Sequence, residues 1–193
     1  RPLPVTPAVV KRRLYAIPIH RIEDPTLQDL FDEKRREIET KLSMLEDRGH
    51  RRFLFGGVIL FGELDASLLA LAHSILQRPK PPARPGAGEA LSADELRDLG
   101  EKEIAYYRQQ SPEFTAKVTV RRDVVGLLAS GGNLVIGAST RMTLRRAHAM
   151  LQHEVGTHLL THYNGKRQPF RLMRSGLPRY LDLQEGLAVF GEY

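Results

Sequence analysis

Residues 153–158 read His-Glu-Val-Gly-Thr-His. Two histidines on one face of a helix can ligate zinc, and a glutamate beside the first of them can act as a general base. The usual spacing is four residues, which places the two side chains about 40° apart around the helix axis. The spacing here is five residues, about 140°, so a straight α-helix does not direct both rings at one ion.

A distortion of the helix resolves this difficulty. One extra residue accommodated as a π-bulge returns His153 and His158 to the same face, and such bulges occur often at functional sites. Gly156 lies between the two histidines, where a backbone distortion costs little. We therefore predict an irregular helix near residues 155–157.

The residues around the motif predict one long helix. Thr143 is a suitable N-cap, and the helix is expected to reach Tyr163 before Asn164 and Gly165 end it. Apolar residues recur along one face, which would also suit an ordinary packed helix without a metal. They are Leu144, Ala147, Leu151, Val155 and Leu159.

Two further histidines of this segment offer alternatives. His162 follows His158 by four residues, so these two form a rival ligand pair, but that pair leaves Glu154 without a role. His148 lies near the apolar face and is expected to be packed, or to support a ligand.

A hydrolytic zinc site has three protein ligands and one open position for water. Glu185, within the Gln-Glu-Gly-Leu-Ala sequence of residues 184–188, is the candidate third ligand on a following helix. Gly186 beside it is expected to permit close packing against the motif helix. The alternative for Glu185 is a first-turn acid that suits the helix dipole.

The rest of the chain predicts an α+β fold that is mainly helical. Residues 1–23 read as an extended entry, and Asp24 followed by Pro25 predicts a helix start. Ser92 and Glu95 have the spacing of a capping box and predict a second helix start.

A small sheet or hairpin is expected before the motif helix. Residues 116–120 alternate as a strand, residues 134–138 form a second strand, and a turn is expected at residues 130–133. The apolar stretch at residues 53–61 is ambiguous between helix and strand.

The length favours a single domain over residues 1–193. The Pro-rich stretch at residues 79–86 is interpreted as a loop inside it. Residues 1–115 are expected to be mostly helical, and residues 116–193 to hold the sheet and the helices of the motif.

The composition excludes several classes of protein. There is no cysteine, hence no disulfide framework and no thiol nucleophile, which fits a reducing compartment such as the cytoplasm. No apolar run approaches the roughly 20 residues of a membrane span, so no membrane partner is expected. The net charge of +6 comes from dispersed basic pairs with only 7% aromatic residues, so no nucleic-acid partner is expected.

Three stretches together resemble a known family. They are the motif with its continuation to Gly165, Arg-Ser-Gly-Leu at residues 174–177, and Gln-Glu-Gly-Leu-Ala-Val at residues 184–189. They resemble the bacterial QEGLA-motif proteins, often labelled as modulators of flavohemoglobin expression. Those proteins share a domain with the microtubule-associated tyrosine carboxypeptidases of animals. The close match covers about residues 126–193.

The resemblance implies a zincin-like metallopeptidase domain that holds one zinc ion. By motif match, His153, His158 and Glu185 become the zinc ligands and Glu154 the catalytic base. The implied reaction is release of a C-terminal residue, tyrosine in the animal relatives, from a peptide or protein. The positive net charge makes acidic peptides candidate substrates. Because family domains continue well past this motif, the chain is expected to be truncated at its C-terminus.

A carboxypeptidase needs a cation for the terminal carboxylate of its substrate. Arg174 and Arg141 are the candidates, because arginine suits a bidentate carboxylate contact. By analogy with zincin-like folds, the strand at residues 134–138 is expected to line the cleft and pair with extended substrate. Candidate donors to the oxyanion are Tyr163, His162 and Tyr180.

Two other classes of function remain open at this point. One is a noncatalytic regulatory or interaction module with a structural metal, although such a site needs no base beside its ligands, which leaves Glu154 unexplained. The other is a DNA-associated regulator that uses the positive charge, which a steep salt dependence of duplex binding would identify.

Overall fold

The computed structural model describes residue 3, residues 5–78 and residues 89–193. The predicted loop at residues 79–86 lies outside the described residues. Clustering of contacts divides the chain into two compact units. The first is Arg1–Pro81 with Leu177–Arg179, and the second is Pro82–Gly176 with Tyr180–Tyr193.

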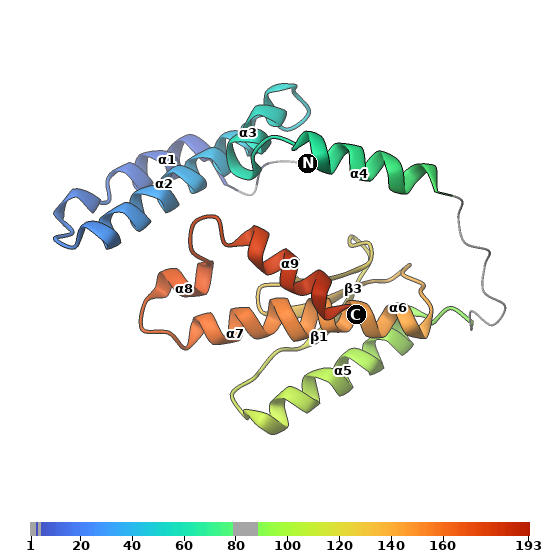
Figure 1. The fold of residues 1–193 in the computed structure, drawn as a ribbon. Coiled ribbons are helices and arrows are strands. Elements are labelled where there is room, and N and C mark those ends of the chain that lie inside the picture. The colour runs from blue at the N-terminus through green and yellow to red at the C-terminus, as the bar shows by residue number, and fades with distance from the viewer. Residues whose placement is uncertain (1–2, 4, 79–88) are drawn as a thin grey trace. The chain divides into compact units, whose positions relative to one another are not determined.

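The first unit is helical (Figure 1). The predicted extended entry is wrong, because Pro7 begins a helix at the position where its missing N–H costs nothing. The predicted start after Asp24 is confirmed, and the Asp24 side chain accepts the Leu27 N–H at 2.9 Å. The helices are α1 (Pro7–Tyr15), η1 (Ile19–Arg21), α2 (Pro25–Glu46), α3 (Arg52–Phe61) and α4 (Ala66–Gln77).

The ambiguous stretch at residues 53–61 is helical and lies in α3. Both α3 and α4 carry exposed apolar side chains, among them Ile59 and Leu76. Throughout the described ranges, no single helix is long and apolar enough to cross a membrane. The helices α3 and α4 reach that length and composition only together, as a pair bent by 106°.

The second unit is built on a three-stranded sheet in the order β1-β3-β2. Its strands are β1 (Val118–Arg121), β2 (Leu127–Ser130) and β3 (Asn133–Gly137). The strand β1 is parallel to β3, and β2 is antiparallel to it. The predicted turn is confirmed: Gly131 and Gly132, both at positive φ, join β2 to β3 as a two-residue hairpin loop.

The central position of β3 corrects the expectation that residues 134–138 pair with a substrate. Its backbone groups already bond to β1 on one side and to β2 on the other. The neighbouring edge strand is β2, which the sequence analysis missed because four residues without alternation give no strand signal.

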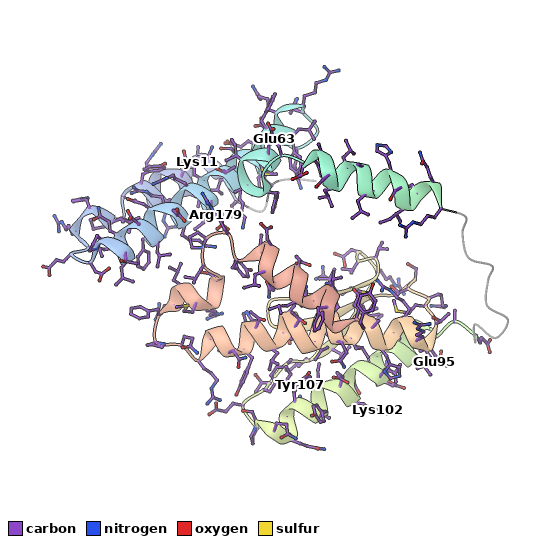
Figure 2. The ribbon with its side chains drawn as sticks, in the orientation of Figure 1. Lys11, Glu63, Glu95, Lys102, Tyr107 and Arg179 are labelled. Carbon is purple, nitrogen blue, oxygen red and sulfur yellow. The ribbon has the colours of Figure 1, made fainter. Side chains whose placement is uncertain are left out.

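Helices pack on this sheet around one core. The capping box of Ser92 and Glu95 is confirmed at the start of α5 (Figure 2). Leu134 and Ile136 of β3 are fully buried against Leu96 and Leu151 of the helices. The helices are α5 (Ala93–Gln110), α6 (Leu144–Leu151), η2 (Gln152–Leu159), α7 (Leu160–Lys166), α8 (Arg171–Ser175) and α9 (Leu181–Gly191).

The end of β3 provides a test of this packing. A Cβ at Gly137 would overlap the backbone carbonyl oxygen of Val124 and lie 2.9 Å from Thr140 Oγ1. We expect Gly137→Ala to lower the free energy of unfolding by about 1–3 kcal/mol, because backbone must move to admit the methyl group. Chemical denaturation measures the loss.

Gly186→Ala is the matched control, since a Cβ there meets nothing within 4 Å. Alanine is favoured over glycine inside a helix by about 1 kcal/mol, so this variant is expected to lose no stability. Equal stability of Gly137→Ala and the unmodified protein would contradict the described packing.

Candidate metal centre

The predicted distortion of the motif helix is confirmed. The segments α6, η2 and α7 follow one another without a break, and η2 is a π-helix over Gln152–Leu159 (Figure 1). A π turn holds one more residue than an α turn, which compensates the five-residue spacing of the histidines. The ring centroids of His153 and His158 are consequently only 4.9 Å apart.

Besides its backbone freedom, the lack of a side chain at Gly156 matters for packing. A Cβ at Gly156 would lie 2.9 Å from Gln152 Oε1 and 3.2 Å from the hydroxyl oxygen of Tyr107, a residue of α5 labelled in Figure 2. The Gln152 amide also donates to Glu103 of α5 at 2.9 Å. The π-helix therefore meets α5 at a point where the ends of the Gln152 and Tyr107 side chains would have to shift to admit a Cβ.

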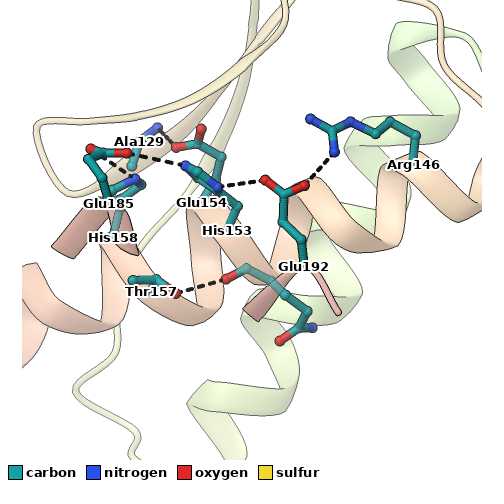
Figure 3. A network of polar contacts seen from close by, with 9 residues as sticks. Ala129, Arg146, His153, Glu154, Thr157, His158, Glu185 and Glu192 are labelled. Atoms are coloured by element: carbon teal, nitrogen blue, oxygen red, sulfur yellow. Dashed lines mark hydrogen bonds and ion pairs between the residues drawn. The ribbon is translucent and has the colours of Figure 1, made fainter. Parts of the chain in front are cut away.

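Three side chains from two helices converge beside η2 (Figure 3). His153 Nε2 lies 3.6 Å from Glu185 Oε2, and His158 Nε2 lies 3.6 Å from Glu185 Oε1. All three donor atoms lie within 4.8 Å of one another. Two imidazole nitrogens and one carboxylate oxygen are a donor set that suits zinc and related divalent ions.

The helix α9 carries Glu185 to this point. Ala188 is fully buried where α9 packs on η2, and a Cβ at Gly191 would lie 3.6 Å from Thr157 Oγ1. The predicted packing role of Gly186 is wrong, because nothing lies within 4 Å of its Cβ position. The acidic residue in the first turn of α9 is Asp182, so the helix-dipole explanation does not apply to Glu185.

Glu192 is a part of this centre that the sequence analysis missed. His153 Nδ1 is hydrogen-bonded to Glu192 Oε1 at 2.9 Å, and Arg146 donates to the other oxygen of Glu192 (Figure 3). The hydrogen bond from Arg146 lowers the pKa of Glu192. Because a carboxylate accepts, Nδ1 carries the hydrogen, which directs the lone pair of Nε2 toward Glu185 and the shared donor cluster. The available sequence signal is spacing: Glu192 follows Glu185 by two helical turns.

Glu154 lies beside these donors and also contacts the sheet (Figure 3). Its side chain is buried, with 7% of the residue exposed, and its Oε2 accepts the backbone N–H of Ala129 at 2.7 Å. Burial raises the pKa of Glu154 above the ordinary value of a glutamate. A buried carboxylate with a raised pKa, next to a cluster of metal donors, is suited to accept a proton and pass it on.

The other histidines lie elsewhere. Within the described part of the chain, His162 does not belong to the donor cluster; its ring packs against Gly132, where a Cβ would lie 3.0 Å away. His148 is exposed, so the expectation that it is packed is wrong.

The remaining candidates lie in three places. Arg174, His162 and Tyr163 line one cavity of about 420 Å³. The Tyr163 hydroxyl is already hydrogen-bonded, since it lies 2.5 Å from Ser111 Oγ.

Arg141 lies at the other end of the motif helix and donates to the Thr140 carbonyl at 2.9 Å. Hydrogen bonds from Ser92, with the charge of Arg141, lower the pKa of Glu95 there. Tyr180 lies against Gly176 after α8.

A cluster of metal donors beside a buried glutamate is the kind of site that hydrolytic enzymes use. Residues 1–193 match the family described as Microtubule-associated tyrosine carboxypeptidase, and the chain belongs to this family. This confirms the resemblance of the motif sequences, and the family name describes a peptidase. No curated protein and no solved structure matches the chain.

The contact between Glu154 and the sheet can be measured directly. Ala129 N–H points away from β3, so Glu154 is its acceptor. We expect Glu154→Ala to accelerate hydrogen exchange of the Ala129 amide about tenfold, the effect of one lost hydrogen bond. Exchange of the Leu128 amide, in the β2–β3 ladder, serves as the internal reference. Unchanged exchange at Ala129 would show that the contact does not form in solution.

Proposed function

We propose that this chain is a zinc-dependent metallopeptidase of the carboxypeptidase type, with a zincin-like catalytic arrangement. The observation that carries the proposal is the convergence of His153, His158 and Glu185 donor atoms within 4.8 Å, next to the buried Glu154. Membership of a family named for a tyrosine carboxypeptidase supports the same class of reaction.

The donor cluster would hold one zinc ion through the Nε2 atoms of His153 and His158 and the carboxylate of Glu185. When bound, zinc polarises a carbonyl oxygen and lowers the pKa of bound water to about 7. Glu192 acts on His153 from the other side of the ring, where it holds the tautomer that leaves Nε2 unprotonated.

Glu154 is the proposed proton carrier. Its Oε2 is held by the Ala129 N–H, which orients the carboxylate and leaves Oε1 to accept a proton from the attacking water. The oxygen of that water bonds to the scissile carbonyl carbon while the C–N bond breaks. The proton held at Glu154 then passes to the nitrogen of the leaving amine.

The edge strand β2 is the proposed backbone partner of the substrate. The pairing of Leu128 with Val135 and the bond from Gly137 N–H to the Gly126 carbonyl direct even-numbered residues of β2 toward β3. The backbone groups of Leu127 and Ala129 therefore point outward, beside Glu154. An extended peptide can pair with their carbonyl groups by β-augmentation.

A purely structural metal module is the less favoured alternative. A structural zinc site is normally closed by a fourth protein ligand and has no use for a base. Burial of an ionisable carboxylate is unfavourable, so the placement of Glu154 beside the cluster is better explained by a catalytic role.

The role of Glu154 is tested with Glu154→Gln in the zinc-loaded protein. We expect kcat/KM on a peptide with a free C-terminus to fall about 10²–10⁴-fold, because the amide accepts no proton. Zinc per chain, measured by elemental mass spectrometry, is expected to stay near that of the unmodified protein. Glu46→Gln, at an exposed ion pair with Lys11, is the control. Full activity of Glu154→Gln would contradict the peptidase mechanism.

The role of Glu192 is tested by zinc affinity. Glu192→Gln keeps the shape of the side chain but loses the charge that supports His153, so we expect zinc to bind about 10–100-fold more weakly. Competition with a chromophoric chelator measures this, again against Glu46→Gln. Unaltered zinc affinity would mean that the Glu192 contact does not support the ligand.

A further inference from the structure

Gln152 is the first residue of the π-helix and directly precedes His153 of the motif. It is half-buried, and it meets two other helices. Its side chain contacts α5, and its backbone carbonyl lies close to Gly191 of α9. The proposed ligands and the proposed proton carrier do not include this residue, so its contacts call for a separate explanation.

The contact between Gln152 and α5 is a directed hydrogen bond. Gln152 Nε2 donates to Glu103 Oε1 at 2.9 Å, and a bond to a carboxylate is stronger than one between neutral groups. Three residues earlier on α5, a Cβ at Gly100 would lie 2.7 Å from the Leu134 side chain and 3.7 Å from the Leu151 side chain. The helix α5 therefore closely approaches residues 151 and 152, where the α-helix changes to the π-helix.

The Gln152 side chain also covers the glycine of the motif. Its Oε1 lies 2.9 Å from the position of a Cβ at Gly156, and the Tyr107 hydroxyl lies 3.2 Å from the same position. Tyr107 follows Glu103 by four residues on α5, and burial, with the charge of Glu103, raises the pKa of Tyr107. The Gln152 amide is thus enclosed by two side chains of α5 and by the backbone at Gly156.

The backbone carbonyl of Gln152 makes a contact of its own. Thr157 Oγ1 donates to it at 3.3 Å (Figure 3). This contact spans five residues, which is the spacing of the hydrogen bonds in a π-helix. A Cβ at Gly191 of α9 would lie 3.6 Å from Thr157 Oγ1 and 3.8 Å from the Gln152 carbonyl oxygen. The π turn is therefore contacted by α5 and by the helix that carries Glu185.

The contacts with α5 also determine where the extra residue lies. Leu151 and Gln152 both meet α5, so the chain stays in register with α6 up to Gln152. An extra residue placed before Gln152 would leave His153 and His158 in an α-helical relation, with their side chains about 140° apart. An extra residue placed after Gln152 brings the two rings together, as observed.

We infer that Gln152, anchored by Glu103, is a positioning residue that fixes the π turn after residue 152 and thereby brings His153 and His158 to one metal ion. The inference rests on the proposed zinc site for its consequence, but the anchoring of the turn is independent of metal. Removal of the anchor is expected to loosen the π-helix in the metal-free protein and to alter the coordination of a bound ion.

Hydrogen exchange of the metal-free protein tests the anchoring. Gln152→Leu keeps the size of the side chain and removes the donor, and we expect amide exchange at residues 155–159 to accelerate about tenfold. Exchange of the Leu128 amide is expected to stay unchanged, as is exchange throughout the control Gln109→Leu, at an exposed glutamine of α5. Unchanged exchange at residues 155–159 would overturn the inference, and equal acceleration at Leu128 would overturn it too, since it indicates a general loss of stability.

The Co²⁺-substituted protein tests the effect on the ligands. Visible absorption of Co²⁺ reports the geometry of its donors, and we expect Gln152→Leu to change the spectrum and to weaken Zn²⁺ binding about tenfold. Gln109→Leu is expected to leave both unchanged. An unaltered spectrum with unaltered zinc affinity in Gln152→Leu would overturn the inference.

An exchange of the two partners provides a rescue. Gln152→Glu sets two carboxylates against each other, and we expect it to accelerate exchange at residues 155–159. Adding Glu103→Gln restores a hydrogen bond with donor and acceptor reversed, so exchange in the double variant is expected to return toward that of the unmodified protein. Absence of any recovery would overturn the assignment of Glu103 as the anchor.

These measurements separate the inference from the proposed function. If the unmodified protein binds neither Zn²⁺ nor Co²⁺, the zinc site fails, whereas hydrogen exchange still decides whether Gln152 fixes the π turn. If the unmodified protein binds Zn²⁺ and Gln152→Leu binds it equally well with the same Co²⁺ spectrum, the positioning role alone is contradicted.

Discussion

The extra residue in the π-helical segment Gln152–Leu159 is the constraint on which the candidate site depends. Without it, His153 and His158 would point about 140° apart, and no single ion or carboxylate would contact both. With it, the two rings lie 4.9 Å apart and Glu185 reaches both of them. The first residue of this segment is tied to α5, since the Gln152 amide donates to Glu103, and Gly156 leaves room for the ends of the Gln152 and Tyr107 side chains.

The last helix contributes to the centre at two levels. Glu185 and Glu192 lie two turns apart on α9 and contact opposite nitrogens of the same imidazole, Nε2 and Nδ1 of His153. Arg146 then ties Glu192 to α6. Ala188 packs between the two acidic residues. One helix therefore supplies both a donor and the support of a donor, so a shift of α9 would disturb both together.

Local signals in the sequence predicted much of this arrangement. The helix starts at Asp24 and Ser92, the turn at Gly131 and the irregularity near Gly156 depend on residues close together in the chain, and all four are present. Features that depend on distant partners were not predictable in this way. The contact of Glu154 with Ala129 and the support of His153 by Glu192 join residues 25 and 39 positions apart in the sequence. The strand β2 lies close to β3 in the chain, but its four residues carry no alternating pattern.

The inserted residue also sets the rotational phase between the two halves of the motif helix. If the same sequence formed a regular α-helix without the π turn, every residue after this turn would be rotated by about 100° relative to the residues before it. His162 would then rotate away from Gly132. The π-helical turn thus allows one continuous helix to direct its metal donors to one side and to place the wall of the cavity against the β2–β3 hairpin.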